Sequence, residues 1–251
     1  MSLEEKITRA AELIRRARTI VAFTGAGIST ESGLSDFRSA GGLWDRYRMI
    51  PFQEFLADEE ARRAYWQMRR ELIPSLLEAR PNAAHYALAE LQQHGKLHAI
   101  ITQNIDGLHQ ASCCNPVIEL HGTNLSASCL ACGREWTIAE IQQRLEQGEE
   151  VPRCHDCNGL IKPDTVSFGQ SMPVAAMEHA FKLAEQCELL LMIGSSLEVQ
   201  PACLIPAAAA DAGAKLIFIN RDPTPYDELA SVCFSESAGV VLEELVERVI
   251  G

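Results

Sequence analysis

Short, largely apolar runs alternate along this chain with longer stretches in which apolar residues recur every three or four positions. The short runs suit strands buried on both faces of a parallel sheet. They lie at residues 20–23, 97–102, 188–193 and 216–219, with a weaker candidate around Val232. The helical spacing is found at residues 3–18, 82–93, 174–186, 202–212 and 240–249. We therefore predict an α/β fold, an open doubly wound parallel sheet of Rossmann type with helices on both faces.

Two segments interrupt this alternation. Residues 34–79 hold aromatic residues, arginines and a helical stretch near residues 58–79, and residues 123–165 hold closely spaced cysteines. We predict that the two insertions form one smaller domain. The first domain then comprises residues 1–33, 80–122 and 166–251. A cleft between the domains would lie at the carboxyl ends of the strands, where open sheets bind ligands.

The composition narrows the possible partners. The 251 residues carry a formal charge of −12, from 34 acidic against 22 basic side chains. The negative electrostatic field of such a chain disfavours nucleic-acid binding, although it could attract a lysine-bearing partner weakly. The sequence has no apolar stretch approaching 18 residues, and its first residues carry acids where a targeting peptide has bases. We expect a cytoplasmic protein without a membrane span or direct nucleic-acid binding.

Four of the nine cysteines have the spacing of a metal site, C-x₂-C, a gap of 21 residues and C-x₂-C. They are Cys129, Cys132, Cys154 and Cys157. In a cytosolic chain this spacing favours one tetrahedral Zn²⁺ held by four thiolates. Because sulfur then fills every position, the zinc is expected to stabilise a small module and to take no part in chemistry. Redox-active cysteine pairs are an alternative, as is a site in which His155 replaces one cysteine.

The first apolar run leads into a glycine-rich turn that begins at Thr24. Gly25 and Gly27 would let the backbone approach a pyrophosphate closely. Thr30, however, stands where the dinucleotide fingerprint has its third glycine, and no second strand ends in an acid about 20 residues later. We predict a nucleotide site that departs from the dehydrogenase pattern. An ordinary glycine-rich turn without a ligand is the alternative.

Polar residues follow three of the predicted strands, at residues 103–106, 194–196 and 220–222. Their amides, hydroxyls and acids could hold riboses, an adenine and a carboxamide. Each group alone is also ordinary turn chemistry, so their coincidence at three strand ends carries the prediction. His121, followed by Gly122 at the domain junction, is a candidate general base because imidazole titrates near neutral pH. Alternatively, His121 is only hydrogen-bonded within the domain junction and takes no part in chemistry.

Six spaced motifs together resemble those of the sirtuins, NAD-dependent protein-lysine deacylases, of the bacterial or archaeal type. In chain order they are Gly-Ala-Gly-Ile-Ser…Asp-Phe-Arg (25–38), Gln-Asn-Ile-Asp (103–106), His-Gly (121–122), the two cysteine pairs, Val-Ser-Phe-Gly (166–169) and Gly-Ser-Ser-Leu (194–197). The resemblance spans nearly the whole chain. It implies NAD as a consumed co-substrate, one structural Zn²⁺ and acyl-lysine proteins or peptides as partners.

The resemblance also implies residue roles. His121 and Asn104 would be catalytic. The NAD-binding residues would be Gly25, Ala26, Gly27, Ile28, Ser29, Phe37, Arg38, Gln103, Asn104, Ile105, Asp106, Gly194, Ser195, Ser196, Asn220, Arg221 and Ala238. The substrate peptide would pair as a strand between two segments, a mode that tolerates many sequences. Its contacts would be Val166, Phe168, Gly169, Leu197 and Val199.

In the reaction that the resemblance implies, the acyl oxygen attacks the ribose carbon that bears nicotinamide, and nicotinamide leaves. His121 then deprotonates a ribose hydroxyl, and water completes the release of free lysine and an O-acyl-ADP-ribose. No hydride moves. This difference from a dehydrogenase accounts for a glycine turn that only half fits the dehydrogenase pattern.

The chain departs from the sirtuin pattern at several positions. Ser35 replaces a proline, and Gln170 replaces the acid that commonly follows Phe-Gly. Sirtuins that remove succinyl or malonyl groups resemble one another in a Tyr-x-x-Arg pair, where this chain has Trp66 and Arg69. Both residues are candidate substrate contacts. Alternatively, Trp66 packs within its helix and Arg69 is solvated, and we predict deacetylation first.

Three other activities remain as alternatives. An NAD(P)-dependent oxidoreductase would use the same glycine turn for hydride transfer. A zinc-ribbon binding module would have no catalysis, although the acidic charge and polar strand ends fit it poorly. Mono-ADP-ribosyl transfer from the same cleft would label a protein acceptor.

Overall fold

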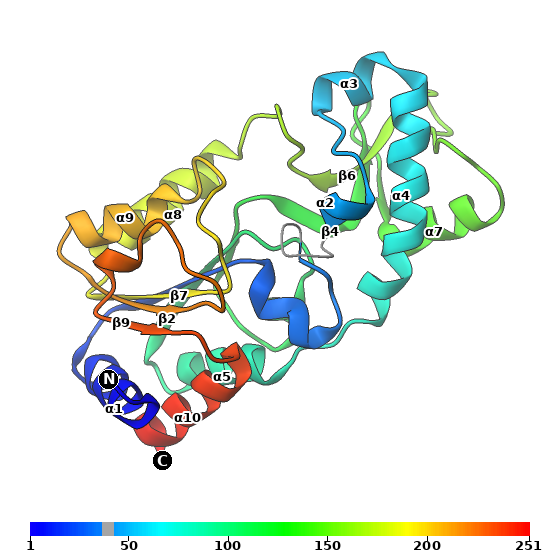
Figure 1. The fold of residues 1–251 in the computed structure, drawn as a ribbon. Coiled ribbons are helices and arrows are strands. Elements are labelled where there is room, and N and C mark those ends of the chain that lie inside the picture. The colour runs from blue at the N-terminus through cyan, green and yellow to red at the C-terminus, as the bar shows by residue number, and fades with distance from the viewer. Residues whose placement is uncertain (37–42) are drawn as a thin grey trace.

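The larger part of the molecule is built on one parallel sheet (Figure 1). The structure is a computed structural model that describes residues 1–36 and 43–251. Its six-stranded sheet has the order β3-β2-β1-β7-β8-β9, and every pairing is parallel. The strands are β1 (Ile20–Thr24), β2 (Leu97–Thr102), β3 (Val117–Glu119), β7 (Leu189–Ile193), β8 (Lys215–Ile219) and β9 (Val232–Phe234). The predicted Rossmann-like sheet is confirmed.

Helices cover both faces of this sheet (Figure 1). One face packs against α1 (Leu3–Arg16), α5 (Ala83–Gln93) and α10 (Ala238–Ile250), and the other against α8 (Val174–Gln186) and α9 (Leu204–Asp211). Ile20 and Ala22 of β1 belong to the first hydrophobic cluster, whereas Val21 and Phe23 belong to the second. Because alternate side chains enter different cores, the strand has to be apolar throughout.

The helix ends follow local capping. Ser2 forms a capping box with Glu5 at the start of α1, and Asn82 forms one with His85 at the start of α5. The first helix ends at Arg16, two residues before its predicted end, because Ala17 is extended. The smaller elements of this part are η1 (Ala26–Ser32), α6 (Leu108–Ala111) and η2 (Asp227–Leu229).

The rest of the described chain forms a smaller body around a three-stranded antiparallel sheet of order β5-β4-β6 (Figure 1). The strands are β4 (Gly122–Cys129), β5 (Glu135–Thr137) and β6 (Ile161–Thr165). The helices are α2 (Leu43–Arg46), α3 (Phe52–Ala57), α4 (Glu59–Glu78) and α7 (Ile138–Glu146). Phe55, Trp66, Ile141 and Ile161 pack in one core, so both predicted insertions contribute to it.

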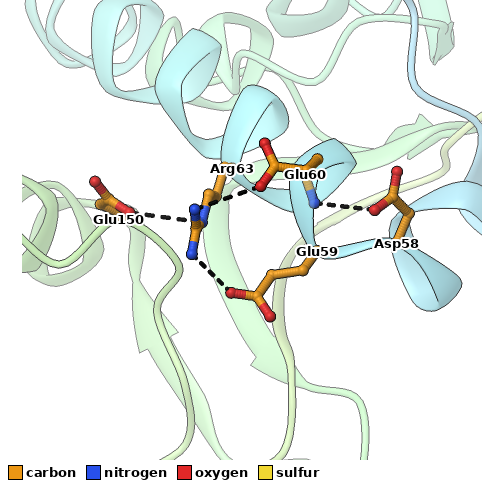
Figure 2. A network of polar contacts seen from close by, with 5 residues as sticks. All are labelled: Asp58, Glu59, Glu60, Arg63 and Glu150. Atoms are coloured by element: carbon orange, nitrogen blue, oxygen red, sulfur yellow. Dashed lines mark hydrogen bonds and ion pairs between the residues drawn. The ribbon is translucent and has the colours of Figure 1, made fainter.

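Figure 2 shows the polar contacts that join α4 to the loop after α7. Asp58 caps α4 by accepting the backbone N–H of Glu60 at 3.0 Å. Arg63 pairs with Glu59 at 2.9 Å, with Glu60 at 3.4 Å and with Glu150 at 3.6 Å. All these groups are exposed, so each ion pair contributes about 0–1 kcal/mol to stability. The smaller body is therefore stabilised mainly by its apolar core. Within residues 1–36 and 43–251, none of the helices is long and apolar enough to cross a membrane.

Candidate active site and metal centre

Three glycines interlock where the glycine turn meets the end of β7. A Cβ on Gly25 would lie 2.6 Å from the Gly194 carbonyl oxygen, and one on Gly27 would lie 2.7 Å from the Gly194 Cα. Gly194 itself has φ +64°, and its Cβ would lie 2.3 Å from the Ile28 nitrogen. The close packing for which the fingerprint uses a third glycine is thus provided by Gly194, which directly follows β7. The contact brings the η1 loop against the carboxyl edge of the sheet.

A cleft runs along this edge and reaches the smaller body. It has a volume of about 420 Å³. The predicted site residues that line it are Gly25, Ala26, Gly27, Arg69, Gln103, Asn104, Ile105, His121, Val166, Phe168, Gly169, Gly194, Ser195, Ser196, Val199, Asn220, Arg221 and Ala238. The fold therefore brings together the turn, the three polar strand ends and the segment after β6.

Some predicted residues lie behind the cleft wall. Ser29 donates to Asp106 Oδ2 at 2.7 Å and accepts from the Asn104 side-chain amide at 3.1 Å. This orientation leaves the Asn104 Oδ1 atom as an acceptor for a ligand hydroxyl. Ile28 and Leu197 are buried and support the wall from within. Phe37 and Arg38 lie outside the described residues.

His121 stands between β3 and β4, where the two sheets meet. Its Nδ1 atom lies 2.9 Å from the Gln103 carbonyl oxygen, which can only accept, so Nδ1 carries the proton and Nε2 keeps its lone pair. Burial lowers the pKa of His121, and the hydrogen bond to Gln103 offsets part of that shift. Gly122 is required next to it, because it has φ +70° and a Cβ there would lie 2.0 Å from the Asp164 carbonyl oxygen. The arrangement presents a neutral imidazole as a base.

The two predicted substrate segments both reach the cleft. The segment after β6 is fixed at Val166, whose N–H donates to the His121 carbonyl at 2.8 Å, and at Phe168, whose carbonyl accepts the Phe52 N–H at 2.8 Å. Gln170 closes the turn by accepting the Ser167 N–H at 3.1 Å, a role that does not require an acid. This segment therefore connects His121 to the smaller body.

The structure places Trp66 away from the cleft, in the core of the smaller body, with 0% of its surface exposed. Its neighbour Tyr65 lines the cleft instead, together with Arg69. The Arg69 guanidinium donates to the Tyr65 hydroxyl and to Asn124 Oδ1, both at 2.9 Å. The tyrosine beside this arginine is thus four positions away along α4, on the same helix face.

Lys162 on β6 is a buried cation near this pair that the sequence did not indicate. Its ammonium group donates to the Thr165 carbonyl at 2.5 Å and to the Pro163 carbonyl at 3.1 Å. Burial, with a smaller contribution from Arg69, lowers the pKa of Lys162 to about 8. Glu31 is a second unforeseen residue, since it lines the cleft and accepts the Gly239 N–H at 3.3 Å.

Four cysteines form a compact cluster at the turns beside β4 and β6. The sulfurs of Cys129, Cys132, Cys154 and Cys157 all lie within 4.8 Å of one another. Cys129 and Cys157 are 3.5 Å apart, and Cys132 and Cys154 are 3.7 Å apart. Thiolates bound tetrahedrally to Zn²⁺ lie about 3.8 Å from one another, so the cluster fits one zinc ion. His155 is exposed and does not belong to the cluster.

Comparisons with known proteins agree with this geometry. The model of the Sir2 family matches residues 25–201, from the glycine turn through His121 and all four cysteines. The chain belongs to the Sir2 family. The predicted resemblance to sirtuins is confirmed, and the match spans most of both bodies.

Several Sir2 relatives are similar over their whole length. A protein of Thermodesulfovibrio yellowstonii named NAD-dependent protein deacetylase is 47% identical over 98% of this chain and 96% of its own. An Archaeoglobus fulgidus protein named NAD-dependent protein deacylase 2 is 40% identical over 98% and 97%. A solved structure of Sir2 with a p53 peptide and NAD⁺ superposes with a TM-score of 0.88 at 34% identity, covering 98% of each chain.

Proposed function

We propose that this chain is an NAD-dependent protein-lysine deacetylase. The reaction converts an acyl-lysine, NAD and water into lysine, nicotinamide and an O-acyl-ADP-ribose. The observation that carries the proposal is the state of His121. Its Nε2 lone pair is free, and the residue lines the cleft together with the glycine turn and residues 166–169. Sir2 relatives named as deacetylases or deacylases, and a Sir2 structure with NAD⁺ and peptide, support it.

In this proposal NAD would be held by residues that line the cleft. The Gly25 and Gly194 crossing would admit the pyrophosphate, Asn220 and Ala238 would hold the adenosine, and Gln103 and Asn104 would hold the riboses. Asn104 Oδ1 accepts a ribose hydroxyl because its amide already donates to Ser29. His121 Nε2 accepts the proton of the ribose hydroxyl that attacks the acyl carbon. NAD supplies a good leaving group, nicotinamide, and the chain supplies orientation and the base.

We propose that the substrate peptide adds as a strand between residues 166–169 and 197–199. Phe168 is 40% exposed, and Val199 lines the cleft across from the segment after β6, which supports this placement. The division into two domains, with residues 34–79 and 123–165 as the smaller one, is part of the same proposal. Its support is that each segment contributes to one separate core.

The four-cysteine cluster would hold a structural zinc ion. The ion would join the turns that flank β4 and β6 and would leave no coordination position for substrate. A thiolate site of this kind requires a reducing compartment, which supports a cytoplasmic location.

Acetyl-lysine is the proposed first substrate. The two terminal nitrogens of Arg69 already donate to Tyr65 and Asn124, so they are partly satisfied without an acyl carboxylate. A second substrate class, acidic acyl groups such as succinyl, is favoured by the cation Arg69, which lines the cleft. The phenol of Tyr65 supplies the hydroxyl that Trp66 lacks.

A panel of acetyl-, succinyl- and longer-acyl-lysine peptides, incubated with NAD and followed by mass spectrometry, tests these proposals. We expect the acetyl peptide to turn over fastest. Arg69→Met should raise the KM for the succinyl peptide about tenfold or more and should change the KM for the acetyl peptide little. Only the succinyl group has a carboxylate that can pair with the Arg69 guanidinium. Absence of turnover on every peptide, without nicotinamide, would contradict the deacylase proposal.

A further inference from the structure

A row of buried polar side chains lies behind the cleft, and the proposed reaction does not use it. His85 on α5, His109 on α6, Thr24 at the end of β1 and Thr102 at the end of β2 are each at most 2% exposed. Burying polar groups is costly unless they are hydrogen-bonded. Their arrangement therefore has to serve the fold or the site.

The two threonines lead directly to the catalytic strand end. Thr24 donates to the Thr102 hydroxyl at 2.8 Å, and Thr102 accepts the backbone N–H of Asn104 at 3.0 Å. The Thr24 oxygen also lies 2.9 Å from His109 Nε2. Because Thr24 gives its only proton to Thr102, it has to accept from His109. Nε2 of His109 then carries the ring proton, and Nδ1 is a bare acceptor.

His85 is held by Asn82. Its Nδ1 atom lies 3.0 Å from Asn82 Oδ1 and 3.3 Å from the Asn82 backbone nitrogen. Because an amide oxygen only accepts, the shorter contact places the proton of the neutral ring on Nδ1. Asn82 also holds the η1 loop, since its side-chain amide donates to the Ile28 carbonyl at 2.8 Å and to the Ser32 hydroxyl at 3.0 Å. Through Asn82, His85 is connected to η1.

The two imidazoles are in contact, with ring centroids 4.9 Å apart and an angle of 56° between their planes. His85 Nε2 and His109 Nδ1 are both buried, and neither has a hydrogen-bond partner among the residues that the structure describes. The rings are therefore packed together and are not hydrogen-bonded to each other. Burial lowers the pKa of both rings, to about 4 for His85 and about 3 for His109, although Asp106 and Glu31 act in the opposite direction on His85.

We propose that His109, packed against His85, is a positioning residue for Asn104. His109 Nε2–H orients Thr24, Thr102 and the Asn104 backbone, and Asn82 holds both His85 and the η1 loop on the other side of the ring contact. Only the role of Asn104 in binding NAD rests on the proposed function. Neither histidine touches the substrate.

Long-range ¹H–¹⁵N NMR of the zinc-loaded chain with ¹⁵N-labelled histidine tests the pair without any turnover. Spectra of His85→Gln and His109→Gln variants assign the two rings. We expect both rings to be neutral at pH 7, with the proton on Nε2 in His109 and on Nδ1 in His85. A proton on Nδ1 of His109, or a cationic ring at either position, would overturn the proposal.

Kinetics test the positioning role. His109→Phe keeps a planar ring but removes the donor to Thr24, so KM for NAD should rise about tenfold with KM for the peptide unchanged. His109→Gln keeps a donor near the Nε2 position and should recover most of that loss, and the exposed His179→Gln is the control. Equal KM values for NAD in His109→Phe and wild type, or equal rises for NAD and peptide, would refute the role.

Misfolding of a variant and failure of the proposed function can each be distinguished from failure of the positioning role. If His109→Phe does not fold, the NMR states of the wild-type rings still decide the protonation of His109, and Thr24→Val, which removes the hydroxyl between His109 and Thr102, takes its place in the kinetics. If the wild-type chain releases no nicotinamide from NAD and acetyl peptide, the proposed function fails, whereas the protonation states of the pair are measured independently.

Discussion

His121 is oriented by one hydrogen bond to a backbone carbonyl, so its protonation state determines whether it can act as a base. Burial lowers its pKa below the ordinary value of 6.5. The neutral ring therefore persists to lower pH than in a free histidine. We expect kcat/KM to be constant around pH 7 and to fall in acid with an apparent pKa below 6.5. A pH profile at subsaturating peptide measures this, and an acid limb above pH 6.5 would contradict the assigned environment.

Gly194 offers a second residue-scale prediction, because its left-handed backbone and its contact with Ile28 both exclude a side chain. Gly194→Ala should destabilise the protein by about 1–3 kcal/mol more than Gly213→Ala and should weaken NAD binding. Gly213 is the matched control, since it has φ +97° but nothing within 4 Å of its Cβ position. Urea unfolding and an NAD titration measure the two effects. Equal effects of the two substitutions would show that the crossing tolerates a methyl group.

The placement of Trp66 illustrates what the sequence could not decide at this scale. Tyr65 and Trp66 are adjacent aromatic residues on α4, and Arg69 is within reach of either position, three or four residues later. Alignment to a motif selects Trp66, but although both rings belong to the core of the smaller body, only Tyr65 also lines the cleft. Only the packing of α4 against the second sheet makes that choice.

At the scale of elements, strands that are buried on both faces were predictable, and strands of the smaller sheet were not. β1 and β7 are continuous apolar runs, because each face packs on helices. β4 has the sequence Gly-Thr-Asn-Leu-Ser-Ala-Ser-Cys, and β5 is three residues long, so neither carries a clear apolar pattern. These strands depend on their partners and on the metal site.

The zinc cluster should therefore be required for the second sheet. Cys157→Ser leaves three thiolates, so zinc content should fall well below one ion per chain and the melting temperature should drop. Catalysis should be lost as well, because β4 begins at the residue after His121. Metal analysis and thermal unfolding measure the effect, with the exposed Cys113→Ser as the control. A variant that keeps its zinc and its melting temperature would exclude Cys157 as a ligand.

At the scale of the whole molecule, the buried histidines should make stability depend on pH. The pKa values of about 4 for His85 and about 3 for His109 lie below the unfolded value of 6.5. Below pH 6.5 the unfolded chain binds more protons than the folded chain. The stabilisation is therefore fully present above pH 6.5 and is lost as the pH falls toward the folded values.

Urea unfolding of the zinc-loaded protein between pH 7 and 5.5 measures this slope. Each histidine should contribute up to about 1.4 kcal/mol per pH unit. His109→Gln should flatten the curve, whereas the exposed His179→Gln should leave it unchanged. A wild-type curve no steeper than that of His109→Gln would mean that His109 is not held neutral in the folded state.

The cleft itself is a property of the whole molecule. The motifs predicted which residues take part, since the three polar strand ends and the segment after β6 do line one cavity. The sequence did not indicate Tyr65 or Glu31 as lining residues, since their positions depend on how the smaller body and α10 pack against the sheet. The histidine pair was also not foreseen, because its members are 24 positions apart and meet only through α5 and α6.

The most direct test of the central claim is the product stoichiometry of one reaction. The purified chain is incubated with NAD and an acetyl-lysine peptide, and nicotinamide, deacetylated peptide and O-acetyl-ADP-ribose are quantified by mass spectrometry. We expect the three products in equal amounts, and their loss in His121→Ala. Deacetylated peptide with free acetate and unchanged NAD, or reduced nicotinamide cofactor in place of nicotinamide, would contradict the account.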